Sequence, residues 1–516
     1  MSLNLASILR NTRRYFPDET AVIHGSFRLT YSELAADVEA FAAYLKKHEV
    51  KQGDKVALLL PNRISFTVAY FGALHVGATV VPMSFLSVAR EVEYVLQDSD
   101  AVVLVAWRAY APQAEEGAQK APTCRHLILV DDPTGHLTVT GKTPIDRTAK
   151  CDMASTSESD SAVILYTSGT TGEPKGAELT HFNMYSNAQF VAERLLWNKT
   201  SFKTLGPGNV TLAALPLFHS FGQTSNQNAT IFAGGALTYL ERFEPQAALE
   251  IMQRDRVTTF SGVPTMYFQL LNFPEVASYD LSSLRYCISG GAPMPVDVLH
   301  AFDARYKVKI LEGYGLSETS PVASFNTFYK PRKPGSIGEA IYGVEMKVVD
   351  NECREIPVGE VGEIVIRGYN VMKGYYKRPE ATAKAFSHGW FHTGDMGRMD
   401  EDGYFYIVDR KKDLIIRGGF NVYPREVEEV LYSHPAVLEA AVVGVASEEY
   451  GEEVKAFVAL KTKGDAAKTT EKNLLEFTKK NLAATKYPRI FEILPELPKG
   501  PTGKILKKEL RPRSEN

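Results

Sequence analysis

A segment rich in glycine and hydroxyl side chains carries the first chemical signal. The apolar run Ser161–Tyr166 predicts a strand, and residues 167–176 hold four hydroxyl side chains, three glycines and Lys175. Glycines let backbone N–H groups approach an anion closely, and hydroxyls and a lysine supply further donors. The segment therefore predicts a loop that binds a polyphosphate, with a plain surface turn as the alternative. It is not a Walker A loop, because Gly176 stands where that loop needs serine or threonine.

Further short motifs follow along the chain. They are Leu215–His219 (LPLFH), Ser289–Pro293 (SGGAP), Gly313–Thr319 (GYGLSET), Thr393–Asp395 (TGD), Tyr406–Pro424 (YIVDRKKDLIIRGGFNVYP) and Pro498–Lys504 (PKGPTGK). In this order, together with the loop, they resemble the adenylate-forming superfamily of acyl-CoA synthetases, luciferases and peptide-synthetase adenylation domains. The resemblance spans about residues 30 to 510. The sequence looks most like bacterial medium- and long-chain fatty acyl-CoA synthetases, and next like 4-coumarate and feruloyl-CoA ligases.

The resemblance implies an AMP-forming acid–CoA ligase. A carboxylate attacks the α-phosphorus of ATP, giving an acyl-adenylate and pyrophosphate, and the thiol of CoA then displaces AMP. Catalysis of this kind rests on positioning and charge neutralisation. Mg²⁺ is expected to bridge the phosphate oxygens, with Glu318 as its protein carboxylate. The expected catalytic side chains are Lys504, Glu318, Lys175 and His219.

The motifs also place the nucleotide. By resemblance, Tyr314 stacks on adenine, Asp395 accepts from the ribose hydroxyls, and Arg410 is the companion of Asp395. Lys504 is expected to reach the α-phosphate and the carboxylate. The full set of expected ATP and AMP contacts is Thr167, Ser168, Gly169, Thr170, Thr171, Gly172, Lys175, Gly290, Gly291, Ala292, Glu312, Gly313, Tyr314, Gly315, Ser317, Asp395, Tyr406, Arg410 and Lys504.

The charged stretch at 409–413 resembles the family's hinge, with Lys412 at the pivot. A small C-terminal domain is expected to swing between one pose for adenylation and another for thioester formation. In the second pose Gly418 and Gly419 would line the passage for CoA, where a pair of glycines suits a thin chain. Lys175 and Lys504 thus serve adenylation, and Gly419 serves thiolation.

The acyl substrate is predicted from the residues expected around it. These are His219, Phe221, Ser225, Val263, Gly291, Gly315 and Val322. The set is largely apolar, and residues 216–230 lack an aspartate to hold an amino group, so a medium- or long-chain fatty acid is favoured over an amino acid. The alternative is an aryl or hydroxycinnamic acid, with Gln223 and Ser225 binding its phenol. A fatty-acyl-AMP ligase and a luciferase-like enzyme are disfavoured.

These residues need a large α/β framework to position them. Short apolar strands alternate with helical stretches up to about residue 335, for example at Ala101–Ala106, Val257–Phe260 and Tyr286–Ser289. This alternation is typical of parallel βαβ sheets covered on both faces. Shorter alternating strands then predict a small β-barrel-like part. We place a large domain at 1–410 and a small mobile α+β domain at 411–516.

Composition excludes other classes. The chain has 516 residues and a net charge of −3, which provides no basic field for nucleic acid. No apolar run is long enough to predict an integral membrane segment. Four widely spaced cysteines suggest reduced thiols and a cytoplasmic setting. A homodimer is compatible with the sequence.

Overall fold

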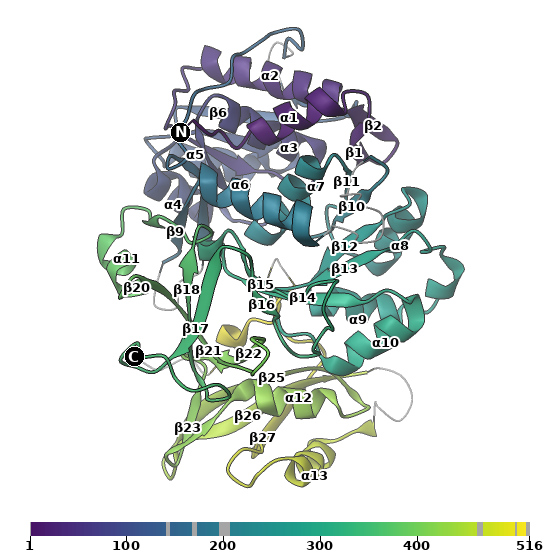
Figure 1. The fold of residues 1–516 in the computed structure, drawn as a ribbon, viewed down its shortest axis with the longest axis vertical. Coiled ribbons are helices and arrows are strands. Elements are labelled where there is room, and N and C mark those ends of the chain that lie inside the picture. Colours follow the sequence, from purple (N-terminus) through teal and green to yellow (C-terminus); the bar gives the residue numbers. More distant parts are fainter. Residues whose placement is uncertain are drawn as a thin grey trace.

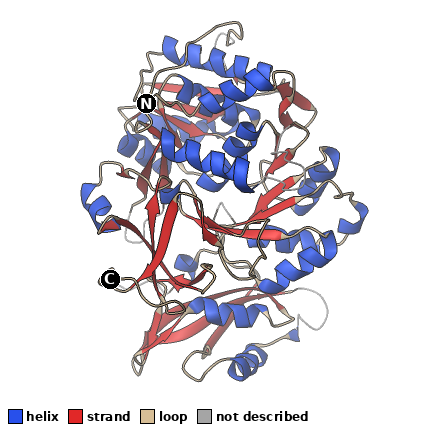
Figure 2. Cartoon of the chain, in the orientation of Figure 1, coloured by secondary structure: helices blue, strands red, loops and turns tan. Residues whose placement is uncertain are grey.

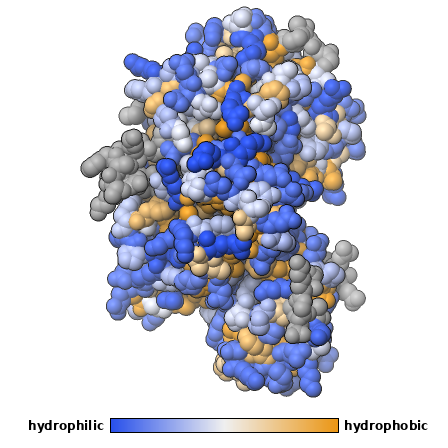
Figure 3. Space-filling view, turned by 90° about the vertical axis from the view of Figure 1, so that its right-hand side faces the viewer, coloured by the Kyte–Doolittle hydropathy of each residue, from blue (hydrophilic) through white to orange (hydrophobic). Residues whose placement is uncertain are grey.

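The computed structural model describes residues 2–140, 145–167, 173–195, 207–461, 468–500 and 503–511. Within them the strands form four sheets, here named A to D in chain order of their main strands (Figure 1). Helices cover sheets A and B, while sheet C stands between these sheets and the C-terminal sheet D (Figure 2). Sheet D and its helices form a smaller lobe below the body, and hydrophilic residues cover much of the face seen in Figure 3.

Sheet A is parallel at its centre, where β5, β3, β4 and β8 lie side by side, and antiparallel at both edges. Strands β3 and β5 at the centre are buried on both faces, as apolar runs without alternation predict. They are β3 (Lys55–Leu59), β4 (Thr79–Pro82), β5 (Ala101–Trp107), β6 (His126–Asp131), β7 (Thr138–Val139), β8 (Ser161–Thr167), β9 (Lys175–Thr180) and β19 (Gly374–Tyr375).

Sheet B repeats this plan. Its centre is parallel from β1 through β11, β10, β12 and β13 to β14, and β2, β15 and β16 add antiparallel edges. The strands are β1 (Thr20–His24), β2 (Phe27–Thr30), β10 (Val210–Ala213), β11 (Ala236–Tyr239), β12 (Thr259–Gly262), β13 (Tyr286–Ser289), β14 (Ile310–Gly315), β15 (Val322–Phe325) and β16 (Glu339–Ala340). The α/β class expected from the sequence is confirmed.

Sheets C and D complete the fold. Sheet C is antiparallel, and its pairings among the described strands do not close into a barrel. Its strands are β17 (Val344–Val349), β18 (Gly362–Gly368), β20 (Phe386–Ser387), β21 (Trp390–Met399) and β22 (Phe405–Arg410). Sheet D holds β23 (Ile415–Arg417), β24 (Phe420–Val422), β25 (Val437–Ser447), β26 (Gly451–Leu460) and β27 (Ile490–Leu494). A turn at 411–414 joins the two sheets; the domain boundary at 410 remains a prediction.

The helices pack on these sheets through their apolar faces. Helix α3 is buried on every side, and α2 packs on it after a capping box formed by Thr30 and Glu33. The α-helices are α1 (Ser7–Tyr15), α2 (Tyr31–Lys47), α3 (Ile64–His75), α4 (Ala89–Ser99), α5 (Ala111–Gln119), α6 (His181–Phe190), α7 (Ala229–Ala233), α8 (Pro245–Arg254), α9 (Pro264–Asn272), α10 (Val296–Tyr306), α11 (Pro379–Ala385), α12 (Pro424–Tyr432), α13 (Glu471–Asn481) and α14 (Lys507–Leu510). Other helical turns are η1 (Arg108–Tyr110), η2 (Val191–Leu195), η3 (Phe221–Asn228), η4 (Val276–Ser278) and η5 (Ser317–Thr319).

Candidate active site

A carboxylate cluster forms where sheet B meets sheet C. Tyr314, near the end of β14, donates its hydroxyl to Asp395 Oδ2 at 2.6 Å, and Arg410 Nε lies 2.8 Å from Asp395 Oδ1. Asp395 is only 2% exposed, so its charge is compensated by these two partners. Burial, and then the charge of Asp395, raise the pKa of Tyr314 well above its ordinary value, which keeps the phenol neutral. Each Asp395 oxygen keeps a lone pair for a further donor.

A second cluster connects the predicted phosphate loop to Glu318. Lys175 begins β9, and its Nζ lies 5.5 Å from the ring centroid of Tyr375. The hydroxyl of the same tyrosine donates to Glu318 Oε1 at 2.9 Å. Glu318 sits in η5 and is buried. Tyr375 therefore holds the carboxylate and lies beside the lysine, although the sequence showed no signal for it beyond a Gly-Tyr-Tyr run.

The C-terminal motif reaches the same region. Thr265, in the first turn of α9, lies 3.5 Å from the carbonyl oxygen of Gly503. Lys504 follows at once, open to solvent but closely surrounded by protein groups, and this desolvation together with Arg410 lowers its pKa to about 8. The neighbouring His219 has a pKa lowered to about 4 by burial and then by the charge of Lys504. The structure thus places Lys504 near Arg410, expected to bind the nucleotide, and near His219, expected beside the acyl group.

His219 is held as a neutral imidazole. The backbone N–H of Phe221 donates to His219 Nδ1 at 3.3 Å, which leaves the proton on Nε2. With a pKa near 4, this ring stays uncharged at neutral pH. It adds no positive charge beside Lys504, so it fits a role in positioning rather than in charge neutralisation.

An apolar wall lies beside these groups. A Cβ on Gly290 would stand 3.1 Å from the ring of Phe221, and one on Gly291 would meet only Val263, at 3.6 Å. Val263 is 5% exposed. These contacts bring together Phe221, Val263 and Gly291 of the set expected to surround the acyl group. Ser225 and Val322 are buried as well.

Models of two protein families match the chain. The AMP-binding enzyme family matches residues 9–376, and the AMP-binding enzyme C-terminal domain matches residues 426–504. The chain belongs to the AMP-binding enzymes. It is 38% identical to a long-chain-fatty-acid–CoA ligase of Bacillus subtilis, over 98% of this chain and 94% of that protein. It is also 38% identical to a feruloyl-CoA synthase of an Amycolatopsis species, over 97% of each chain.

Solved structures agree with this assignment. ATP-bound MatB from Rhodopseudomonas palustris superposes with a TM-score of 0.88 at 31% identity, over 99% of this chain and 98% of that one. The anthranilate CoA ligase AuaEII, in complex with anthranoyl-AMP, gives a TM-score of 0.90 at 28% identity, over 99% and 97%. This AMP-binding enzyme is an acid–thiol ligase that uses ATP and CoA. No helix of the described segments is long and apolar enough to cross a membrane.

Other predicted site residues of this AMP-binding enzyme lie around the clusters. Thr167 ends β8 opposite Lys175; Ser168, Gly169, Thr170, Thr171 and Gly172 lie outside the described residues. Gly313 and Gly315 belong to β14, Ser317 begins η5, and Ala292 follows Gly291 in a bend. Glu312 accepts backbone N–H groups of Met294 and Gly335, and burial raises its pKa to about 7.

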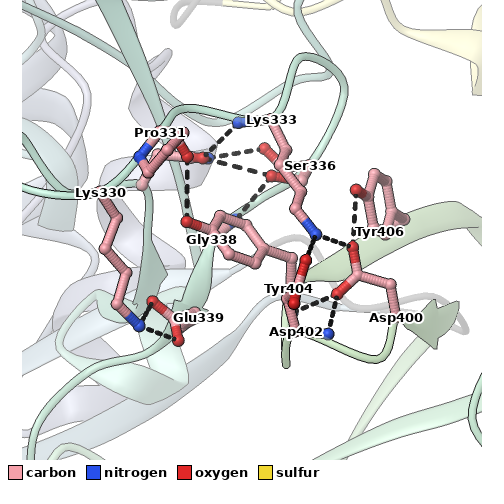
Figure 4. A network of polar contacts seen from close by, with 11 residues as sticks. Lys330, Pro331, Lys333, Ser336, Gly338, Glu339, Asp400, Asp402, Tyr404 and Tyr406 are labelled. Atoms are coloured by element: carbon pink, nitrogen blue, oxygen red, sulfur yellow. Dashed lines mark hydrogen bonds and ion pairs between the residues drawn. The ribbon is translucent and has the colours of Figure 1, made fainter.

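The structure brings Tyr406 to a different cluster. Its hydroxyl donates to Asp400 Oδ2 at 3.0 Å, and Arg398 lies 4.3 Å above its ring. Lys333 also pairs with Asp400, at 2.6 Å (Figure 4). These contacts account for Tyr406 as part of the β21–β22 hairpin, and its expected contact with the nucleotide remains a prediction.

The local backbone conformation explains why residues 418 and 419 are both glycine. They form the two-residue loop between β23 and β24, where Arg417 pairs with Phe420. Their φ angles are +56° and +82°, and a hairpin turn with both central residues at positive φ favours glycine. The expected contact with CoA remains a prediction.

Proposed function

We propose that this enzyme converts a medium- or long-chain fatty acid to its acyl-adenylate, releasing pyrophosphate, and then to acyl-CoA with release of AMP. The observation that carries the proposal is the meeting of Lys504 with the Tyr314–Asp395–Arg410 cluster beside an apolar wall. A charged nucleotide end and an apolar acyl end are what such a reaction needs. The fatty acid ligase of B. subtilis supports the choice of acid.

Each cluster has a distinct part in the proposed reaction. Asp395 binds the ribose hydroxyls, while Tyr314 places its ring against adenine. Lys504 lies between the α-phosphate and the attacking carboxylate and offsets their mutual repulsion. Lys175 binds the phosphates that leave as pyrophosphate. The neutral His219 ring borders the acyl group.

The metal proposal rests on Glu318. Within the described residues its buried carboxylate has one hydrogen-bond donor, Tyr375, and so retains lone pairs for a cation. Among the described residues no group of three His, Cys, Asp or Glu side chains could hold a metal by itself. This fits Mg²⁺, which is bound in such sites through one or two carboxylates together with substrate phosphates. When bound, Mg²⁺ supplies neutralisation of phosphate charge.

Removing the Tyr375 hydroxyl tests whether its hydrogen bond positions Glu318 for Mg²⁺. Tyr375→Phe leaves the ring beside Lys175 but frees Glu318 from its hydrogen bond, and we expect the Mg²⁺ concentration for half-maximal pyrophosphate release to rise about tenfold. Mn²⁺ binding in the presence of ATP, followed by electron paramagnetic resonance, should weaken in parallel. Tyr376→Phe is the matched control, because the hydroxyl of Tyr376 donates to Asp100 at 3.1 Å. Equal effects of the two variants contradict the proposed role of Tyr375 in positioning Glu318.

The function is tested by AMP release with ATP and Mg²⁺, measured with and without CoA. The acids run from acetate to palmitate and include benzoate, coumarate, ferulate and several amino acids. A CoA-dependent maximum among aliphatic acids of medium or long chain is expected. AMP release that ignores CoA contradicts the ligase, and a maximum at an amino acid contradicts the choice of acid.

A hydroxycinnamic acid is the second candidate. The feruloyl-CoA synthase relative is as similar in sequence as the fatty acid ligase, and it covers 97% of each chain. Gln223 and Ser225 are both buried in η3, the helix that begins with Phe221. A maximum at coumarate or ferulate in the same assay selects this candidate.

Gly291→Leu tests the acyl wall. A side chain here has open space and meets only Val263, so the leucine is expected to fill the acyl region and to shorten the preferred acid by several carbons. The positive φ of 78° adds backbone strain of about 1 kcal/mol. Gly389→Leu controls for strain, since Gly389 has the same φ on an exposed turn. An unchanged chain-length profile in Gly291→Leu means that the acid lies elsewhere.

The hinge and the surroundings of the enzyme remain predictions. Lys412 is the middle of the turn between β22 and β23, where Asp413 N–H donates to the Arg410 carbonyl. This turn is where the backbone passes from sheet C to sheet D. We therefore assign the pivot here and the domains to 1–410 and 411–516. A cytoplasmic location and a homodimer stay predictions from the sequence.

A further inference from the structure

A cysteine, a histidine and a glutamate meet on one face of sheet C, outside the clusters described above. Strands β17, β18 and β21 lie side by side in this sheet (Figure 1). Val349 pairs with Glu363, and Val365 pairs with His392. Residues two apart along a strand share a face, so these four side chains lie on the same side of the sheet. Cys353, in the turn that follows β17, packs against an apolar cluster that includes Val349 and Val365.

The His392 ring connects the other two polar side chains. Its Nε2 lies 3.7 Å from Cys353 Sγ, a hydrogen-bond contact for sulfur, and its Nδ1 lies 3.4 Å from Glu363 Oε2. A carboxylate can only accept, so it favours the proton on Nδ1 and leaves Nε2 to accept from the thiol. Cysteine and glutamate thus stand at opposite ends of the ring, and the three side chains are not among any described group that could hold a metal ion.

Two further donors hold Glu363 in place. The backbone N–H of Gly394 donates to its Oε1 at 3.1 Å, and Lys411 Nζ donates to its Oε2 at 3.2 Å. The carboxylate is therefore fixed on the side of the ring away from Cys353. A nucleophile in contact with a base, and a base oriented by a third group, is the arrangement that activates cysteine and serine nucleophiles.

The backbone at residue 353 gives no reason for a cysteine. Its φ angle is +62°, in the left-handed region that glycine adopts at least cost and other residues adopt rarely. Strained positions of this kind are found mostly at functional sites. Cys353 is half-buried, and its neighbours Asn351, Glu352 and Arg354 are exposed. A small reagent can therefore reach the sulfur.

We propose that Cys353 is a modification site that forms a mixed disulfide with a small thiol compound, activated by His392 and Glu363. His392 takes the thiol proton as the sulfur attacks one sulfur of a small-molecule disulfide. The new sulfur–sulfur bond forms while the bond of the attacking reagent's partner sulfur breaks, and the leaving thiolate takes the proton from His392. The cysteine sulfur is oxidised and the leaving sulfur is reduced. The site is independent of the proposed function, because none of its three side chains belongs to the nucleotide or acyl clusters.

The disulfides of glutathione and of CoA are two sources of this chemistry, and both are used as probes. The reduced full-length protein is treated with each at pH 7, and mass spectrometry of its peptides follows the adduct on every cysteine. An ordinary thiol is only a few per cent ionised at this pH, so we expect Cys353 to react at least about tenfold faster than Cys151 with one disulfide or both. The faster reagent identifies the source. Equal rates at the two cysteines with both reagents overturn the proposal.

Cys151 is the internal control for accessibility. It is half-buried as well, but its thiol donates to the carbonyl oxygen of Asp152 at 3.6 Å. The nearby His75 ring is engaged with the carbonyl oxygen of Cys151 at 2.7 Å. The other two cysteines are expected to react more slowly still, because burial raises the pKa of the Cys124 thiol to about 11 and raises that of Cys287 as well.

Variants show whether the rate comes from His392. His392→Asn should lower the rate at Cys353 to within about twofold of that at Cys151, which itself should not change. His388→Asn is the matched control, because His388 lies in the exposed β20–β21 turn with its Nδ1 2.8 Å from the Ser387 hydroxyl, and both rates should match wild type. Unfolding the wild type in urea, which needs no variant to fold, should bring the ratio of the two rates close to one. A ratio that persists in urea, or that His392→Asn leaves unchanged, overturns the proposal.

Discussion

Lys504→Ala is expected to lower the rate of acyl-adenylate formation about 10²- to 10³-fold, the usual loss when one positioned charge is removed from a transition state. Pyrophosphate release in a single turnover measures this step. Thioester formation from supplied acyl-AMP should stay near the wild-type rate, because the phosphorus–oxygen bond is already made and the proposed role of Lys504 ends with it. Equal losses in the two half-reactions contradict that role.

The control for Lys504→Ala lies in the same motif. Lys499 pairs with Glu439 at 2.9 Å, and both residues belong to the C-terminal lobe. Lys499→Ala removes one lysine charge from the lobe without touching the nucleotide cluster. We expect it to leave both half-reactions within about twofold of wild type, because the lost ion pair joins two residues of the lobe and neither belongs to the nucleotide cluster.

The pKa of Lys504 also predicts a pH dependence. The ammonium is charged below its pKa of about 8 and neutral above it, so kcat/KM for adenylation should fall as pH rises through about 8. Lys504→Arg, which stays charged, should lose this alkaline limb even if its rate is lower. An unchanged limb in the arginine variant assigns the titration to another group.

The sequence predicted the framework well where apolar runs and turns agreed. Tyr286–Ser289 was predicted as a strand and is β13, residue for residue. At Val257–Phe260 the prediction was wrong by two residues, because Val257 is buried among the helices of sheet B before the strand begins at Thr259. Burial in the core and membership of a strand produce the same apolar signal, so local pattern alone could not separate them.

From the sequence, only those site residues that belong to a recognisable motif could be predicted. The Asp395–Arg410 contact joins two motifs and was expected from the resemblance to the family. The role of Tyr375 and the burial of the polar residues of η3 were not, because both depend on which residues meet across the fold. A tyrosine next to another tyrosine carries no spacing signal, and polar letters in a helix read as a solvated face until their burial is known.

A disulfide across the two domains is expected to stop the second half-reaction. The structure holds the C-terminal lobe with Gly503 against α9, and the position of a Cβ on Gly503 lies 3.4 Å from Thr265 Oγ1. Cysteines at both positions would place a sulfur close to the separation that a disulfide requires. With Thr265→Cys and Gly503→Cys oxidised, the lobe is tied in this pose.

The tied enzyme should still form acyl-adenylate but lose thioester formation at least about a hundredfold, because the proposed swing about Lys412 can no longer occur. Single-turnover pyrophosphate release and acyl-CoA formation, measured on the oxidised protein, separate the two steps before CoA can exchange with the bond. Dithiothreitol should restore thioester formation, and each single cysteine variant should be insensitive to it. The native cysteines are free thiols, so the wild-type enzyme oxidised in parallel is the control for bridges that they form. If the oxidised double variant makes acyl-CoA as fast as the same variant treated with dithiothreitol, one pose serves both half-reactions. Gly418 and Gly419 then need no approach to CoA.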